Sequence, residues 1–428
     1  MHPLIHEDAA PALRSLTATP AEVPPRFVRG DGVYLYDEAG RAYLDCAAGT
    51  FNVSLGHGHP EVVAAMRAQA ELLVQGSAAY RSPLVDELRR RLAAVAPPGL
   101  GQAHVKACSG STANEAAIRF AQHVTGRRDV VSLHRSHHGQ TALTTCVSGD
   151  SRRRAGLEQQ FAGTVHVPGP YCLRCFYRQR PQTCGLLCAE RVSDFIDYAS
   201  SGSVACLIVE PILGNGGNIV APDGYLAVLR RICDERGIVL IFDEVQTGIG
   251  RTGRMFAADH YGVVPDVMTL AKGLGGAGVP IAAVLASEDL PRMPADLPAF
   301  TGGGNLVGVA AAVKTLEIVG RPGFLAQVQR VGGGILERLR TLQARTPAIG
   351  DVRGVGLMIG VEIVGPGGAP DPGLTNRLAL AGLDHGLVLR TSSYGRGNVV
   401  KVRPPLVIGE EDAETLCHRF EELVEAVC

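Results

Sequence analysis

The fold is decided by the stretch IVLIFDEVQTGIGRTG at residues 238–253, together with PDVMTLAKGLGG at residues 265–276. Residues 238–242 form a continuous apolar run that ends at Asp243, which is typical of a buried strand in a parallel sheet. A second apolar run ends at Lys272, and glycines follow it. Open parallel sheets bind ligands at the carboxyl ends of their strands. We therefore expect Asp243 and Lys272 to face one crevice.

A lysine and an aspartate at such a crevice suit one kind of chemistry. The lysine amine can form a Schiff base with an aldehyde, and a buried carboxylate can keep a heteroaromatic nitrogen protonated. Both are requirements of pyridoxal phosphate. The two motifs resemble the signature of class-III aminotransferases, and this resemblance extends over nearly the whole chain. A purely structural Lys–Asp pair is the alternative, and the further motifs below count against it.

The resemblance implies an α/β chain of fold type I, with a mostly parallel seven-stranded sheet between helices. It also implies a smaller α+β domain built from the N- and C-terminal segments. We expect residues 1–50 to supply the N-terminal part of that domain, including a hairpin that turns at residues 38–40. Residues 51–305 are expected to form the large cofactor-binding domain, and residues 306–428 the C-terminal part of the small one.

Length and composition agree with an enzyme of two domains. The chain has 428 residues, of which 46% are hydrophobic, and its net charge is −1. This charge gives no reason to expect a nucleic-acid or membrane partner. No apolar run reaches transmembrane length, and the N-terminus lacks the order of a secretory signal. The eleven cysteines are then expected to be reduced thiols in the cytoplasm.

Residues 105–126 predict a strand, a tight turn and an amphipathic helix. Ser109, Gly110 and Ser111 lie at the start of this helix, where free N–H groups and the helix dipole attract an anion. We interpret them as a cradle for the cofactor phosphate. An ordinary helix cap is the alternative. Thr112 stands where the family usually has an acidic residue, which makes the cradle less negative.

Four further residues are assigned to the cofactor by resemblance. His137 takes the place of the aromatic residue that stacks on the pyridine ring, and His138 matches the family's histidine. Glu210 ends another predicted strand and is expected near the cofactor and substrate. Gln246 follows Asp243 by about one helical turn and is expected to bind the hydroxyl of the ring.

The resemblance also suggests residues that contact the substrate or a second subunit. Phe51 and Tyr80 lie in loops that the family uses near the substrate. Lys401 occupies the position of an arginine that binds a substrate carboxylate in many relatives, with Arg403 close by. Thr301 corresponds to a threonine that reaches the partner subunit's cofactor phosphate. This predicts a homodimer whose active sites are shared across the interface.

A group of cysteines is left over from this interpretation. Cys172, Cys175, Cys184 and Cys188 follow the pattern C-x2-C-x8-C-x3-C. Free thiols, disulfides and a structural zinc site all remain possible. The family resemblance does not decide among them.

The predicted activity is that of a pyridoxal-phosphate-dependent aminotransferase, a transferase that works by a ping-pong cycle. Lys272 would hold the cofactor and then act as the base, and Asp243 would keep the ring nitrogen protonated. The donor is an amino acid or amine, and the acceptor a keto acid, an aldehyde or an oxidised sugar. An epimerase, an aminomutase or a phospho-lyase on the same scaffold is the alternative.

Overall fold

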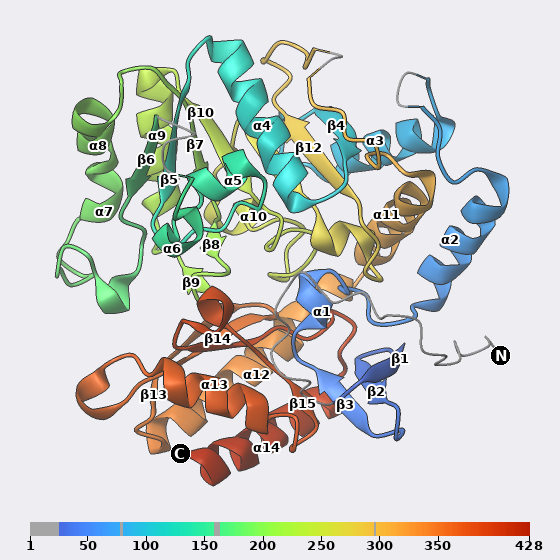
Figure 1. Ribbon diagram of the computed structural model, residues 1–428, viewed down its shortest axis with the longest axis vertical. Coiled ribbons are helices and arrows are strands. Elements are labelled where there is room, and N and C mark those ends of the chain that lie inside the picture. The colour runs from blue at the N-terminus through green and yellow to red at the C-terminus, as the bar shows by residue number, and fades with distance from the viewer. Residues whose placement is uncertain (1–24, 78–79, 158–162, 295–296) are drawn as a thin grey trace, which may run out of the picture.

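The computed structural model describes residues 25–77, 80–157, 163–294 and 297–428. Figure 1 shows a larger part built around one sheet and a smaller part that combines the strands β1 to β3 with elements of the C-terminal segment. The predicted segment 1–50 lies within the described residues only from residue 25 onward. Within the described ranges, no helix has both the length and the apolar character needed to cross a membrane.

The larger part contains the predicted seven-stranded sheet, and the fold type I prediction is confirmed. Its order is β4-β12-β11-β10-β7-β5-β6. The strands are β4 (Gln102–Ala107), β5 (Asp129–Leu133), β6 (Thr164–Val167), β7 (Val204–Val209), β10 (Val239–Asp243), β11 (Val267–Leu270) and β12 (Ala282–Ala286). β10 runs parallel to β7 and β11, whereas β12 is antiparallel to both of its neighbours. Asp243 and Lys272 therefore follow adjacent parallel strands.

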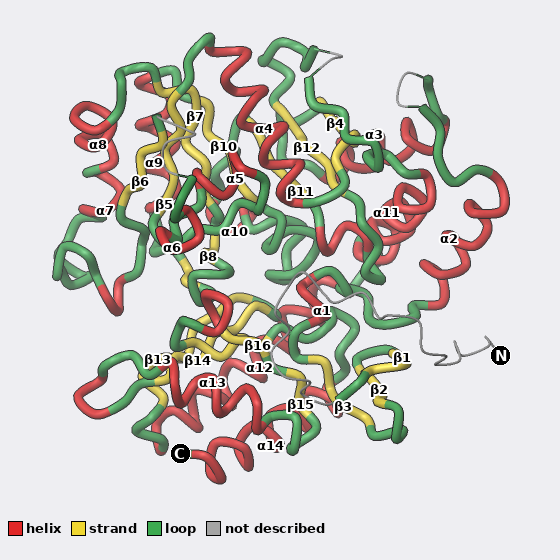
Figure 2. The backbone as a smooth tube through the Cα atoms, in the orientation of Figure 1, coloured by secondary structure: helices red, strands yellow, loops and turns green. Residues whose placement is uncertain are grey.

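Both faces of this sheet are buried, because successive side chains of a strand point to opposite sides. Cys206, Ile208 and Ile241 pack with the apolar face of α4 (Gly110–Thr125). Leu207 and Phe242 pack on the other side, in the core that contains α9 (Tyr225–Arg236). Figure 2 shows helices on both sides of these strands. The unbroken apolar runs in the sequence reflect this double burial.

The remaining helices of the larger part are short or lie around its rim. They are α2 (Pro60–Leu72), α3 (Pro83–Val95), α5 (Ala142–Val147), α6 (Ser151–Arg154), α7 (Leu187–Glu190), α8 (Val192–Ala199), α10 (Ala258–Tyr261) and α11 (Leu306–Val319). Two 3-10 turns, η1 (Cys172–Arg174) and η2 (Lys272–Gly275), and the strand pair β8 (Ile212–Leu213) and β9 (Ile219–Val220) complete it. Val309 and Leu316 of α11 are buried in the same core as the large sheet.

The smaller part joins the N- and C-terminal segments in one core. One sheet combines β1 (Phe27–Asp31), β2 (Tyr34–Asp37) and β3 (Ala42–Asp45) with β15 (Leu387–Val388). The other has β13 (Ile349–Val355), β14 (Met358–Ile363), β17 (Val399–Val402) and β16 (Arg390–Thr391). The other elements are α1 (Ala48–Phe51), α12 (Phe324–Arg345), α13 (Pro372–Ala381), α14 (Glu410–Val427), η3 (Pro366–Gly368) and η4 (Ser392–Gly395). Val33 and Leu44 pack with Leu378 and Phe420.

The N-terminal hairpin forms where the sequence predicts it. β2 and β3 pair antiparallel, and the turn between them is closed by a hydrogen bond from the Gly40 N–H to the Asp37 carbonyl, 3.0 Å long. Gly40 has a φ of 81°, in the left-handed region that glycine adopts without strain. The chain then enters α1, which brings residues 50 and 51 to the edge of the large part.

Candidate active site

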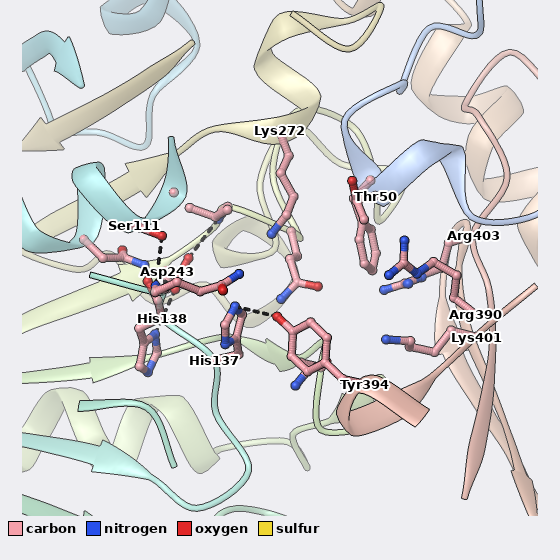
Figure 3. A pocket seen from close by; sticks show the side chains of 18 of the residues that line it. Thr50, Ser111, His137, His138, Asp243, Lys272, Arg390, Tyr394, Lys401 and Arg403 are labelled. Carbon is pink, nitrogen blue, oxygen red and sulfur yellow. Dashed lines mark hydrogen bonds and ion pairs between the residues drawn. The ribbon is translucent and has the colours of Figure 1, made fainter. Parts of the chain in front are cut away.

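The carboxyl ends of β10 and β11 open into a cavity of about 420 Å³. It is lined by residues of both parts of the molecule: Thr50, Phe51, Gly110, Ser111, Asn114, His137, His138, Gly139, Gln140, Asn215, Asp243, Val245, Gln246, Lys272, Arg390, Thr391, Tyr394, Lys401 and Arg403. Figure 3 shows the amine of Lys272 pointing into this cavity. Asp243 and Lys272 thus share one crevice, as the sequence predicts.

Lys272 lies just past β11, at the start of η2, and has a φ of 42°. A non-glycine residue in the left-handed region is strained, and such strain is common at functional sites. Burial lowers the pKa of the Lys272 amine to about 8, against the opposing effect of the Asp243 and Glu210 carboxylates. Roughly a tenth of the amine is therefore neutral and nucleophilic at pH 7, far more than for an exposed lysine.

The carboxylate of Asp243 is fixed by two side chains. Its Oδ2 accepts hydrogen bonds from Nδ2 of Asn114, at 2.7 Å, and from Nδ1 of His138, at 2.8 Å. Asn114 is held in turn by the hydroxyl of Thr269, which donates to its Oδ1 at 2.6 Å. The sequence interpretation includes His138 but not Asn114. Only the helical position of Asn114, one turn into α4 and facing β10, could have indicated it.

Glu210 supports the cavity without lining it. Its Oε1 accepts the backbone N–H of His137 at 2.7 Å, and its Oε2 accepts the amide of Gln246 at 2.9 Å and the Gly214 N–H at 2.9 Å. Burial and then the nearby Asp243 carboxylate raise the pKa of Glu210 to about 7. Glu210 thus fixes the positions of two cavity residues that were predicted to bind the cofactor.

The start of α4 has the geometry of an anion cradle. Ser109 caps the helix by accepting the Thr112 N–H at 3.2 Å, and Thr112 Oγ1 accepts the Ser109 N–H at 2.9 Å. Gly110 and Ser111 follow and line the cavity with N–H groups that have no partner one turn earlier in the helix. A Cβ on Gly110 would lie 2.7 Å from Cγ1 of Val245, so only glycine lets the helix approach this closely. The predicted cap and the predicted cradle are the same structure.

Three cations, which we call the cationic wall, face the cavity from the smaller part: Arg390, Lys401 and Arg403. Figure 3 shows them across the cavity from Asp243. Arg403 is only 1% exposed, and its Nε and Nη1 have no hydrogen-bond partner within the described chain. Its guanidinium carbon lies 3.1 Å from the ring centroid of Phe51. Burial, and then the neighbouring cations, hold the pKa of Lys401 well below its usual range.

His137 contacts two residues that the sequence interpretation did not identify. Its Nε2 lies 2.9 Å from the hydroxyl of Tyr394, and its Nδ1 lies 3.4 Å from Nη1 of Arg153. Burial, followed by the charges of Lys272 and Arg153, lowers the pKa of His137 to about 3. The imidazole is therefore neutral at physiological pH. A neutral planar ring of this kind can stack on another aromatic ring.

Four predicted site residues do not line this cavity. Ser109 and Glu210 support it as described above, whereas Tyr80 and Thr301 lie elsewhere. Tyr80 is 82% exposed and lies at a second cavity together with Gly303 and Leu306. Thr301 is exposed in the turn that precedes α11. The four clustered cysteines are free thiols around one small cavity, and no group of three or more His, Cys, Asp or Glu side chains in the described ranges is arranged so that it could hold a metal ion.

These residues fit pyridoxal phosphate. The cavity combines a partly neutral lysine, a carboxylate held in place, and a helix start that a Cβ would obstruct. The orphaned nitrogens of Arg403 add a position for an anionic substrate. Pyridoxal phosphate supplies an aldehyde that condenses with amines and a ring that takes up electron density.

Comparison with known proteins gives a consistent picture. The sequence profile of the family "Aminotransferase class-III" matches residues 18–424. A diaminobutyrate–2-oxoglutarate aminotransferase of Rhizobium meliloti is 35% identical over 94% of this chain and 89% of its own. A leucine/methionine racemase of Thermococcus litoralis is 33% identical over 94% and 90%. The crystal structure of a PLP-bound amine transaminase from an uncultivated Pseudomonas species superimposes with a TM-score of 0.88 and 29% identity, covering 99% of this chain and 100% of that one.

Proposed function

Because the chain belongs to the class-III aminotransferase family and is a pyridoxal-phosphate-dependent aminotransferase, we propose that Lys272 and Asp243 perform its chemistry on a carboxylate-bearing substrate. The orphaned guanidinium of Arg403, next to Lys401 and Arg390, is the observation that supports this choice of substrate. Burying a cation without hydrogen-bond partners costs free energy unless a bound ligand supplies the missing partners.

The two residues have separate tasks. Lys272 Nζ holds the cofactor at rest and is then the base that takes a proton from the substrate carbon next to the amine. Its lowered pKa of about 8 keeps part of it neutral for this transfer. Asp243, fixed by Asn114 and His138, holds the proton on the ring nitrogen.

We propose matching roles for the other cavity residues. Ser109 orders the start of α4, so that Gly110 and Ser111 can hold the cofactor phosphate. The neutral ring of His137 packs against the pyridine. Gln246, oriented by Glu210, reaches the ring hydroxyl. Phe51 supports Arg403 from below.

The cationic wall favours substrates that carry a carboxylate in both half-reactions. An amino acid donor and a keto acid acceptor each carry a carboxylate that these three cations can pair with. An amine or aldehyde without a carboxylate would leave them unpaired. Lys401 provides one such contact, but it lacks the bidentate fork of an arginine.

The proposal is tested by adding amino donors to the PLP-loaded enzyme and following the cofactor absorbance. We expect glutamate or alanine to bleach it, and 2-propylamine, which has no carboxylate, to do so far more slowly. Lys401→Met should raise the KM for the carboxylate donor about 10- to 100-fold, whereas Lys401→Arg, which keeps a cation, should leave the KM close to that of the parent enzyme. Equal rates for donors with and without a carboxylate would contradict the cationic wall as a specificity element.

The same assay separates transamination from racemisation, the activity named for one relative. A transaminase would convert about one donor molecule per site to its keto acid and then stop until an acceptor keto acid is added. A racemase inverts its amino acid and needs no keto acid. Lys272→Ala should abolish either activity, so this variant serves as the common control.

We also propose that the enzyme is a homodimer in which Thr301 of each chain contributes to its partner's active site. Thr301 is exposed and does not line the cavity of its own chain. It lies in the same turn as Gly303, next to an exposed apolar segment at residues 72–74. We place the protein in the cytoplasm, where free thiols such as those of Cys172 and Cys175 persist.

We propose that the chain divides into a large unit, residues 51–305, and a small unit formed by residues 1–50 and 306–428. The shared core of Val33, Leu44, Leu378 and Phe420 supports the union of the two chain ends. The packing of α11 in the core of the large unit moves the second boundary of this proposal from residue 305 to the segment between α11 and α12.

A further inference from the structure

Two segments of the larger part and one distant segment of the smaller part meet at one edge of the cavity. His137 follows β5, Arg153 lies on α6, and Tyr394 lies in η4 of the smaller part. Figure 3 shows Tyr394 between His137 and the cationic wall, with its hydroxyl directed at the imidazole. The roles proposed above use His137, but they use neither Tyr394 nor Arg153.

The contacts of His137 determine which ring nitrogen carries its proton. A guanidinium group has only N–H donors, so the contact of Arg153 Nη1 with Nδ1, at 3.4 Å, requires a lone pair on Nδ1. The pKa of about 3 means that the ring has one proton in all at neutral pH. This proton is therefore on Nε2.

The hydrogen bond to Tyr394 then has a defined direction. Nε2–H donates to the phenolic oxygen across 2.9 Å, so the hydroxyl proton of Tyr394 is not used in this bond. The aromatic ring of Tyr394 is held in place by two contacts. The guanidinium carbon of Arg153 lies 4.1 Å from the centroid of this ring, and the imidazole of His137 makes an edge contact with it, with 5.5 Å between the ring centroids. The Ser393 N–H donates to the Asn215 carbonyl at 3.0 Å, which anchors the turn.

The backbone of this turn is itself unusual. Ser393 and Tyr394 have φ values of 47° and 54°, in the left-handed region that only glycine adopts freely. A strained turn persists when the surrounding contacts determine it, and here those contacts aim one phenol into the cavity. Tyr394 lines the cavity together with Lys401 and Arg403.

We propose that Tyr394 donates its hydroxyl proton to an oxygen of the bound substrate, and that Arg153 is a positioning residue that keeps this proton available by fixing the tautomer of His137. This inference extends the proposed function and rests on it, because a substrate carboxylate bound at the cationic wall would lie next to the Tyr394 hydroxyl. A substrate with an acceptor oxygen near the phenol is favoured over one without.

The tautomer is tested by NMR of the PLP-loaded enzyme labelled with ¹⁵N-histidine, with His137→Asn identifying the His137 signals. We expect a protonated Nε2 and an unprotonated Nδ1. A proton on Nδ1, or on both nitrogens at neutral pH, would overturn the proposal. In Arg153→Met the tautomers should mix, whereas Arg153→Lys, which keeps a donor, should retain the parent pattern.

The donated proton is tested by binding of succinate, a carboxylate that cannot react, measured by calorimetry on the PLP-loaded enzyme. Tyr394→Phe should weaken binding about 10- to 100-fold, because it removes one hydrogen bond to a charged group. Unchanged affinity would overturn the role of Tyr394. Arg152→Met, which removes an exposed charge one residue away, should leave the affinity unchanged.

Arg153 acts through Tyr394, which a double-mutant cycle can verify. Arg153→Met should weaken succinate binding about 3- to 10-fold alone and have no further effect in Tyr394→Phe. Additive losses would show that Arg153 acts independently. If succinate does not bind the parent enzyme, the proposed substrate class fails, and the NMR result then decides the tautomer proposal separately.

Discussion

The Nζ amine of Lys272 is acted on by groups that shift its pKa in opposite directions. Burial lowers the pKa most, the carboxylates of Asp243 and Glu210 raise it, and Arg403 lowers it again, to about 8 from 10.5. Only the neutral amine attacks an aldehyde. The rate at which the cofactor-free enzyme takes up pyridoxal phosphate should therefore rise about tenfold per pH unit below pH 8 and level off above it. Stopped-flow absorbance measures this directly.

Because the nearby carboxylates raise the pKa of Lys272, removing one of them provides a control for the pH dependence of cofactor uptake. Glu210→Gln removes a group that raises the pKa, so the midpoint should move to lower pH. An exposed lysine should behave like the free amine. A midpoint near 10.5 in the parent enzyme would show that Lys272 is hydrated in solution and would contradict the buried position.

Asn114 carries a second prediction, because it is the buried amide that orients Asp243. Its Nδ2 donates to Asp243 at 2.7 Å and also to the His138 carbonyl at 2.7 Å. Asn114→Ala should lower the free energy of unfolding by about 1–3 kcal/mol, as expected for a buried carboxylate that loses a donor. Urea unfolding measures this loss. The affinity for pyridoxal phosphate should fall as well.

Thr269→Val is the matched control for Asn114. It leaves Oδ1 of Asn114 without its donor but does not touch the carboxylate. Stability should fall, while the affinity for pyridoxal phosphate should change little. If both variants weaken cofactor binding equally, Asn114 acts through general packing and not through Asp243.

Residues at the ends of regular strands could be predicted from the sequence, and residues in irregular turns could not. Asp243 and Lys272 each end an apolar run, so the pattern placed them correctly. Tyr394 lies in a short turn with positive φ values, and Arg390 begins a strand of only two residues, β16. No periodicity marks such positions. The contact between His137 and Tyr394 joins residues 257 positions apart, which only the folded chain brings together.

The helix α4 was predicted with its start and its apolar face, since small residues and a 3.6-residue period occur together there. Its tight contact with Val245 was not, because it depends on how closely two elements approach. Gly110→Ala places a methyl group 2.7 Å from Cγ1 of Val245, a stiff β-branched side chain. We expect α4 to shift and the affinity for pyridoxal phosphate to fall about tenfold or more. Equilibrium dialysis measures it.

The contact suggests its own rescue. In the double variant Gly110→Ala with Val245→Ala the added methyl group has space, so part of the lost affinity should return. Gly333→Ala is the control, because a Cβ there meets no atom within 4 Å. If Val245→Ala does not rescue Gly110→Ala, the backbone N–H groups of α4 have been disturbed in some other way.

The cavity is lined by residues of both parts of the molecule, so it forms only when the N-terminal and C-terminal segments of the smaller part pack together beside the larger part. The residues proposed to hold the cofactor come from the larger part, whereas the cationic wall and Tyr394 come from the C-terminal segment. The backbone N–H of Arg403, just after β17, donates to the Cys46 carbonyl at 2.8 Å and so connects the end of β17 to the N-terminal segment. A shift of the small part would therefore change substrate contacts while leaving the cofactor residues in place.

Three neighbouring apolar residues are exposed on the surface of the single chain. Leu72 is 81% exposed, and Leu73 and Val74 beside it are 52% and 49% exposed. The Leu306 N–H donates to the Val74 carbonyl at 2.9 Å, so this apolar segment adjoins the Thr301 turn. Exposed apolar residues that cluster in this way are typical of interfaces. A partner that covers them would also meet Thr301.

Leu72→Glu should therefore shift the protein toward monomers in sedimentation velocity experiments, because it places a charge in the core of the proposed interface. The monomer should also lose pyridoxal phosphate faster, since each site would lack the partner's threonine. Leu380→Glu is the matched control, as Leu380 is 57% exposed on α13. Thr301→Ala should keep the dimer but weaken cofactor binding. A Leu72→Glu monomer that retains its cofactor and full activity would show that each chain has a complete site, and the shared-site proposal would then be wrong.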